Sequence, residues 1–152
     1  MLPRPDRVVT SPLRRARDTA AALDTAVEID ERWIELDYGD LDGVPAAGVG
    51  QEVWDRWRTD PAHVPARGES LVDLGRRVRF ACEELAGDAL DGVVVVVTHV
   101  SPIKAAIAWS LGVSDAIAWR MYVEDATITR VAVDAAGLPV LRSFNEYVLR
   151  PL

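Results

Sequence analysis

Apolar and polar positions alternate along the chain with two different periods. In some segments apolar residues recur every three or four positions, which is the spacing of one face of an α-helix. This spacing predicts helices at residues 13–23, 53–57, 71–85 and 103–111. Other segments are short runs rich in valine, isoleucine and threonine, which are typical of β-strands. These runs predict strands at residues 7–10, 27–29, 93–97, 119–122, 127–133 and 138–143.

The run of valines from Val93 to Val97 indicates how the strands are arranged. No polar residue interrupts it, so we expect a strand that is covered on both faces, as in a parallel sheet. Helices alternate with strands as far as residue 111, and residues 134–137 predict a hairpin between the last two strands. The pattern therefore predicts an α/β fold, a three-layer αβα sandwich with a mainly parallel sheet, in a single domain of residues 1–152.

Length and composition narrow the classes of function. A chain of 152 residues with 49% hydrophobic and 27% charged residues is typical of one globular domain. Its net charge of -7 argues against nucleic acid or an anionic membrane surface as a partner. No apolar run is long enough to span a bilayer or to form a signal peptide, so we expect a cytoplasmic protein. Cys82 is the only cysteine, which rules out an internal disulfide.

Two segments share one design, a strand end followed by serine and proline. They are residues 8–12 and residues 96–102. Serine is a favoured N-cap and proline is favoured at the first helical position, so we expect helices to begin at Ser11-Pro12 and Ser101-Pro102. In a parallel sheet such turns lie at the carboxyl edge, where ligands bind, and helix N-termini attract anions.

The residues around these turns predict an anion site. Arg14, Arg15 and Arg17 follow the first turn, and the second contains His99, one of two histidines in the chain. An arginine fork and an imidazole beside two helix starts would suit a phosphate. The alternatives are solvated surface arginines and a histidine with a structural role. Glu35, in an apolar stretch, fits either a general acid or an exposed residue on an alternating strand. The residues alone do not identify a reaction.

Five segments nevertheless occur in the order in which the histidine phosphatase family, related to phosphoglycerate mutases, carries its motifs. Residues 10–20 resemble the family's Ser-Pro-Leu-x-Arg-Ala segment, and residues 35–43 resemble its Glu-x-x-Tyr/Phe-Gly loop. Residues 68–70 resemble its Gly-Glu-Ser, and residues 94–99 its valine-rich strand that ends in a second histidine. Residues 126–129 and Asn145 resemble its C-terminal signatures. Together they cover nearly the whole chain.

The resemblance implies roles for four residues. Arg15 corresponds to the arginine that holds the transferring phosphoryl group, and His99 to the second histidine of the pocket. Glu35 corresponds to the general acid, and Ser11 lies at the pocket edge, where we expect packing or a secondary contact. The implied function is hydrolysis of a phosphorylated small molecule through a phosphohistidine intermediate. It requires no cofactor and no metal.

The sequence also departs from the family. Val100-Ser101-Pro102 replaces glycines after the second histidine, a form similar to alpha-ribazole phosphatases and to actinobacterial phosphatase domains fused to ribonuclease H; no ribonuclease H domain fits this chain. The family's first strand leads into Arg-His-Gly, which carries the nucleophile, but the sequence contains no Arg-His-Gly. Neither His63 nor His99 has that context. We therefore expect the family's N-terminal strand and helix to be missing.

This departure leaves two functions open. The first is a phosphatase or mutase-like enzyme of which residues 1–152 lack the first segment. The second is a noncatalytic phospho-ligand binder or scaffold. The sequence names neither the phosphomonoester nor the oligomeric state, and a homodimer is compatible with it.

Overall fold

The computed structural model describes residues 3–147. Two 3₁₀ turns matter for the site, η2 (Glu31–Trp33) and η5 (Asp115–Arg120). The helices and strands are β1 (Arg7–Thr10), α1 (Arg14–Ala20), β2 (Val27–Ile29), α2 (Gln51–Thr59), α3 (Leu71–Asp91), β3 (Val94–Val97), α4 (Val100–Leu111), β4 (Thr127–Val133) and β5 (Pro139–Tyr147).

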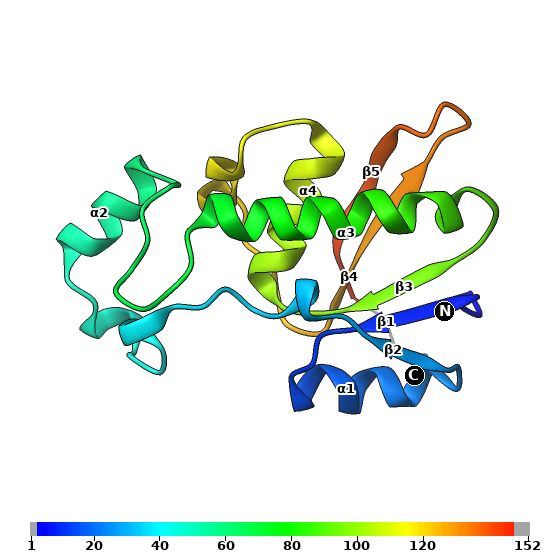
Figure 1. Ribbon diagram of the computed structural model, residues 1–152, viewed down its shortest axis with the longest axis horizontal. Coiled ribbons are helices and arrows are strands. Elements are labelled where there is room, and N and C mark those ends of the chain that lie inside the picture. Colours follow the sequence, from blue (N-terminus) through cyan, green and yellow to red (C-terminus); the bar gives the residue numbers. More distant parts are fainter. Residues whose placement is uncertain (1–2, 148–152) are drawn as a thin grey trace.

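A parallel sheet of order β2-β1-β3 forms the centre of the fold. The middle strand is β1, in which Val8, Val9 and Thr10 are buried almost completely. Helix α1 lies on one side of this sheet, and α3 and α4 lie on the other (Figure 1). The predicted α/β class with a mainly parallel sheet is confirmed.

The last two strands form a separate antiparallel hairpin, β4-β5. Its turn matches the predicted one, because the Asp134 carboxylate accepts hydrogen bonds from the backbone N–H groups of Ala136 and Leu138 at 2.8 and 2.9 Å. Within residues 3–147, β3 pairs only with β1 and β4 only with β5. Helices α1 and α3 contact β3 from the two sides of the sheet, but its valines are half-buried rather than fully buried as the valine run suggested. A strand that has a neighbour on one side only leaves part of its side chains accessible.

Two elements on the pocket side of the fold differ from the sequence prediction. Helix α3 continues past Gly87 to Asp91, because a glycine costs a helix only about 1 kcal/mol, which the packing of the other residues outweighs. The strand predicted at residues 119–122 is wrong. Trp119 belongs to η5, where its indole N–H donates to the Trp57 carbonyl at 3.1 Å. This tertiary contact overrides the strand-like local pattern.

The core lies between α3 and the segment that leads to the predicted acid Glu35. The apolar stripe of α3 is buried as predicted, and it packs against Trp33, Leu36 and Trp57. Ser70 caps the helix by accepting a hydrogen bond from the Asp73 N–H at 3.0 Å. Because Trp33 and Leu36 are held in this core, Glu35 between them is fixed in position. None of the helices described in residues 3–147 is both long and apolar enough to cross a membrane.

Candidate active site

The turn after β1 fixes Ser11 between two strands. The Ser11 N–H donates to the Val97 carbonyl at 3.0 Å, which extends the pairing of β1 with β3. The fully buried Ser11 hydroxyl accepts a hydrogen bond from the Leu13 N–H at 3.2 Å. Helix α1 begins only at Arg14, so the expectation that Ser11 caps it is wrong. Leu13 is extended (φ -69°, ψ 136°), which keeps residues 11–13 outside the helix.

The turn after β3 has a different geometry. His99 is the N-cap residue of α4, and Ser101 and Pro102 lie inside the first helical turn rather than at its start. The proline is tolerated there because the first N–H groups of a helix have no intrahelical partner. Before the turn, the Thr98 hydroxyl donates to the Trp33 carbonyl at 2.6 Å. The start of α4 is thereby tied to the segment that carries Glu35.

Arg15, His99 and Ser11 form a hydrogen-bonded chain. Arg15 Nε lies 3.2 Å from His99 Nδ1, and His99 Nε2 lies 2.7 Å from Ser11 Oγ. A guanidinium can only donate, so Nδ1 is the acceptor, and the ring proton on Nε2 is donated to Ser11. Burial, and then the positive charge of Arg15, lower the pKa of His99 below its ordinary value. The imidazole is therefore neutral near pH 7.

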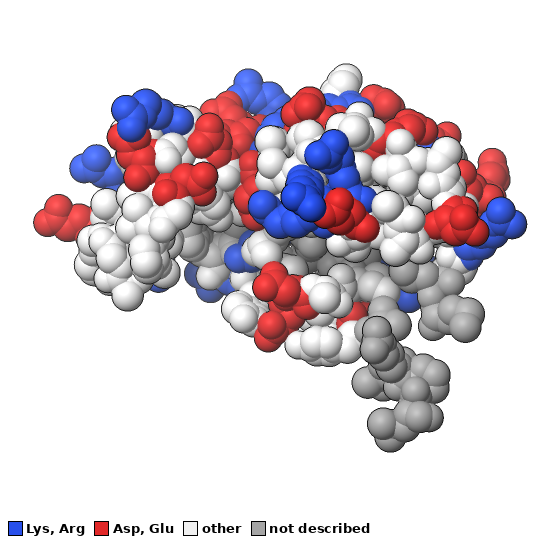
Figure 2. All heavy atoms as spheres, turned by 90° about the horizontal axis from the view of Figure 1, so that it is seen from below, with Lys and Arg blue, Asp and Glu red and all other residues white. Residues whose placement is uncertain are grey.

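Arg15 itself is accessible. Its side chain is exposed, and within residues 3–147 its two terminal Nη groups have no hydrogen-bond partner. Seen from the α1 side, basic side chains gather over α1, although the protein has a net charge of -7 (Figure 2). The arginine fork can therefore receive an anion.

Glu35 lies at the start of α4. Its Oε1 accepts hydrogen bonds from the Leu36 N–H at 2.8 Å and from the Ser101 N–H at 3.2 Å. The second oxygen has no partner within the described part of the chain. The structure thus brings together all four residues proposed from the sequence, Ser11, Arg15, Glu35 and His99, at the carboxyl end of the parallel sheet.

Sequence reasoning missed Arg77, which holds the Glu35 segment from α3. Its guanidinium pairs with the Glu69 carboxylate at 2.7 and 2.9 Å. It also donates to the carbonyls of Arg32 at 2.6 Å and Glu35 at 3.3 Å. The Gly-Glu-Ser motif drew attention to Glu69, its middle residue. No local pattern indicates that Glu69 pairs with Arg77, eight positions later.

Two glycines bring the loop after Glu35 close to that motif. Gly39 has φ +56°, and a Cβ there would lie 2.1 Å from the Ala66 carbonyl oxygen. A Cβ on Gly68 would lie 2.6 Å from the Asp37 carbonyl oxygen. Only glycine allows the two backbones to approach this closely. The contact places the Tyr38 hydroxyl 3.3 Å from the Ser101 hydroxyl.

This arrangement can bind an anion and move a proton. It offers an open guanidinium fork, a neutral imidazole and a carboxyl group with one free oxygen. In the described residues no group of three or more histidine, cysteine, aspartate or glutamate side chains could hold a metal ion. The groups present suit a phosphate ester better than a substrate without charge.

Comparison with known proteins identifies the family. The model of the histidine phosphatase superfamily (branch 1) matches residues 3–146. The chain belongs to this superfamily. A glucosyl-3-phosphoglycerate phosphatase of Mycolicibacterium vanbaalenii is 37% identical over 121 residues, which are 69% of this chain and 53% of that protein. Phosphoserine phosphatase 1 of Hydrogenobacter thermophilus is 34% identical over 116 residues, 71% of this chain and 55% of that protein.

The histidine phosphatase chain is shorter than these relatives. It is 37% identical to a bifunctional protein of Mycobacterium tuberculosis over 111 residues, which are 68% of this chain and 30% of that protein. It therefore spans about a third to a half of the length of these three relatives. Among solved structures, a mycobacterial glucosyl-3-phosphoglycerate phosphatase aligns with a TM-score of 0.82 at 28% identity, covering 95% of this chain and 78% of that one.

Proposed function

We propose that this chain carries the phosphate-binding and proton-donating groups of a phosphomonoester hydrolase. The observation that carries the proposal is the Arg15–His99 hydrogen bond at the same helix start that holds Glu35. The relatives named as phosphatases support the reaction class. The proposed substrate is a phosphorylated small molecule, and the proposed chemistry uses no metal. We also propose that residues 1–152 act as one domain.

Each residue has a role in this reaction. The free Nη groups of Arg15 bind two oxygens of the phosphoryl group, and neutral His99 is held in place by Ser11. A nucleophile attacks phosphorus while the ester P–O bond breaks, and Glu35 gives its proton to the leaving oxygen to form the alcohol. Water then attacks the phosphorylated nucleophile, returns one proton to Glu35 and releases inorganic phosphate.

The nucleophile is the open part of the proposal. His63 is the other histidine of the chain, and within residues 3–147 it shares no hydrogen bond with Arg15, His99 or Ser11. We propose that the nucleophilic histidine is supplied by a segment outside residues 3–147, which pairs with the free side of β3. The same observation favours a second candidate, a phospho-ligand binder that performs no catalysis.

Phosphate binding tests the first part of the proposal. The chain of residues 1–152 should bind inorganic phosphate or orthovanadate weakly, and we expect Arg15→Ala to weaken binding by at least about tenfold, because charged hydrogen bonds contribute about 1.5–3 kcal/mol. Arg15→Lys should rescue poorly, since an ammonium cannot form the bidentate contact. Calorimetry measures both effects, and a chelator should leave binding unchanged.

Arg14→Ala is the matched control. Arg14 is the neighbouring residue on α1, is exposed and pairs with Asp18, so phosphate affinity should stay at the wild-type value. Equal affinity in Arg15→Ala and wild type would refute the site. For the nucleophile, turnover of an aryl phosphate by residues 1–152 should be negligible. Robust turnover that His99→Ala abolishes would show that His99 is itself the nucleophile.

A further inference from the structure

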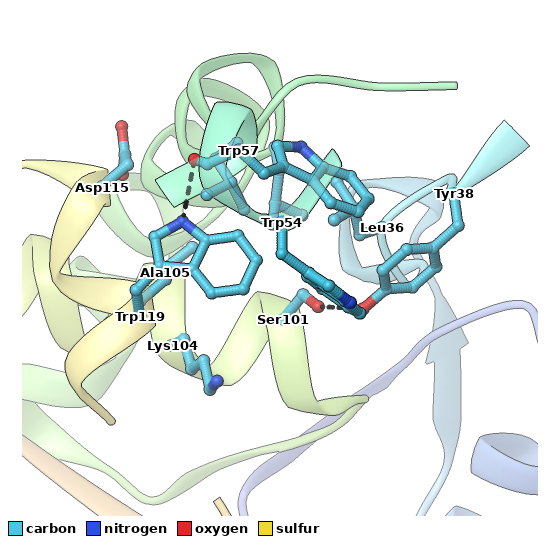
Figure 3. Close-up of a pocket in the computed structure, with 12 residues that line it drawn as sticks. Leu36, Tyr38, Trp54, Trp57, Ser101, Lys104, Ala105, Asp115 and Trp119 are labelled. Atoms are coloured by element: carbon cyan, nitrogen blue, oxygen red, sulfur yellow. Dashed lines mark hydrogen bonds between the residues drawn. The ribbon is translucent and has the colours of Figure 1, made fainter. Parts of the chain in front are cut away.

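An aromatic pocket lies directly beside the proposed general acid. Its volume is about 170 Å³, and three tryptophans are among the residues that line it. Trp54 lies 6.0 Å from the rings of both Trp57 and Trp119, and its ring is nearly perpendicular to that of Trp119. Tyr38 closes one side, with its hydroxyl bonded to Ser101 (Figure 3). A cavity of about 150 Å³ accommodates one benzene ring, so this pocket suits a single planar ring.

The pocket and the phosphate site lie close together at the start of α4. Ser101 lines the pocket, and its backbone N–H donates to Glu35 Oε1. His99 precedes Ser101 by two residues, which is about 3 Å along a helix axis. A phosphate held by Arg15 and His99 therefore places the leaving group of its ester near Glu35 and near Ser101, which lines the pocket.

The pocket contains one charged group without an ion-pair partner. Lys104 is the only lysine among the 17 basic residues of the chain, and it follows Ser101 by one helical turn on the same face of α4. Within residues 3–147 no carboxylate lies within ion-pair distance of its amine, whereas Asp115 on the opposite wall is paired with Arg79 at 3.4 Å. Its amine is directed away from the indole rings (Figure 3).

Burial lowers the pKa of Lys104, and the nearby Glu35 carboxylate partly opposes this effect. A half-buried amine without a local counter-ion gains from an anionic ligand, which restores the interactions that burial removed.

We propose that the leaving group of the substrate is a planar ring with an anionic substituent, the ring lying in the pocket against Trp54 and the anion contacting Lys104. This inference rests on the proposed function, because it assumes that the phosphate lies at Arg15 and His99. It assigns the pocket to substrate selection and names the substrate class, anionic aryl or heteroaryl phosphomonoesters.

Competition with bound phosphate tests the substrate class without requiring turnover. The probes are methyl phosphate, phenyl phosphate and 4-carboxyphenyl phosphate. Their binding is measured by tryptophan fluorescence and calorimetry. We expect phenyl phosphate to bind about tenfold more tightly than methyl phosphate, since aromatic stacking contributes about 1–3 kcal/mol. The carboxylate should add a further factor of about three to ten.

Variants separate the two contacts. Trp54→Leu should remove the preference for phenyl over methyl phosphate. Lys104→Met should remove only the gain from the carboxylate, and Lys104→Arg should keep most of it. Trp109→Phe is the control, because Trp109 lies on α4 outside the pocket. Circular dichroism verifies that each variant is folded.

The single lysine gives a second measurement. Acylation of Lys104 by an amine-selective reagent, located by peptide mapping, should be slowed more by 4-carboxyphenyl phosphate than by phenyl phosphate. Failure of inorganic phosphate itself to bind would refute the proposed function. Arg15-dependent phosphate binding with equal affinities for the three esters would instead refute the pocket assignment alone.

Discussion

The two strand-to-helix turns of the site carry nearly the same motif and fold differently. In the first, Thr10-Ser11-Pro12, the helix begins two residues after the proline; in the second, which ends in Ser101-Pro102, it begins two residues before the proline. The second turn has His99 and Val100 inserted between threonine and serine, and His99 takes the N-cap position. A serine-proline pair therefore does not define a helix start by itself, because the residues before it determine where helical geometry begins.

The two serine residues therefore make different contacts. The Ser11 hydroxyl oxygen is buried and accepts hydrogen bonds from the His99 Nε2–H and the Leu13 N–H. Ser101 donates its backbone N–H to Glu35, and among residues 3–147 its hydroxyl forms a hydrogen bond only with Tyr38. The first turn therefore positions the histidine, and the second positions the acid.

The largest effect expected from this comparison is on stability. Ser11→Ala leaves the buried His99 Nε2–H and the part-buried Leu13 N–H without an acceptor. It should cost about 2 kcal/mol, since an unmade buried hydrogen bond costs about 1–3 kcal/mol. Ser101→Ala keeps its backbone N–H and should cost under about 1 kcal/mol. Urea unfolding of the two variants measures both changes, and equal losses would contradict the different roles of the two serines.

Features that depend on local sequence could be predicted. The sheet, its helices and the hairpin could be predicted, because their apolar periods are set by burial against one layer. Arg15 and His99 could be predicted because turns after parallel strands meet at one edge. The acid role of Glu35 came from the resemblance, since its pattern also suited an exposed strand.

Other features could not be read from local sequence. Arg77 and the pocket depend on partners distant in the chain: Glu69 and the Glu35 carbonyl for Arg77, and residues from α2, α4 and η5 for the pocket. The failed strand at residues 119–122 has the same cause. The conformation of Trp119 is set by its contact with Trp57 rather than by its local propensity.

A second, smaller effect concerns pH and tests the neutral state of His99. Its folded-state pKa is lowered, so the unfolded chain binds the proton first as the pH falls below about 6.5. The stability that neutral His99 contributes is therefore present above that pH and is lost as the pH falls toward the folded pKa. Unfolding free energies between about pH 7 and pH 5 should fall more steeply for wild type than for His99→Gln.

Saturating phosphate sharpens this test. A bound anion favours the imidazolium, so it should raise the pKa of His99. The unfolding free energy of the wild-type protein should then depend less steeply on pH. The His99→Gln slope should stay the same with and without phosphate. A steeper slope in the variant than in wild type would mean that His99 is charged in the folded protein.

The smallest effect concerns the hydroxyl pair of the second turn. Tyr38 is half-buried, and burial raises the pKa of its phenol, so the phenol stays protonated over the working pH range. Its 3.3 Å contact with Ser101 is long for an O–H···O hydrogen bond. A double-mutant cycle of Tyr38→Phe and Ser101→Ala should therefore give a coupling energy of only about 0.5 kcal/mol. The Ser11→Ala and His99→Gln cycle should give a clearly larger coupling, because that contact is 2.7 Å long and buried. Coupling energies in the opposite order would mean that the second turn, rather than the first, depends on its serine hydroxyl.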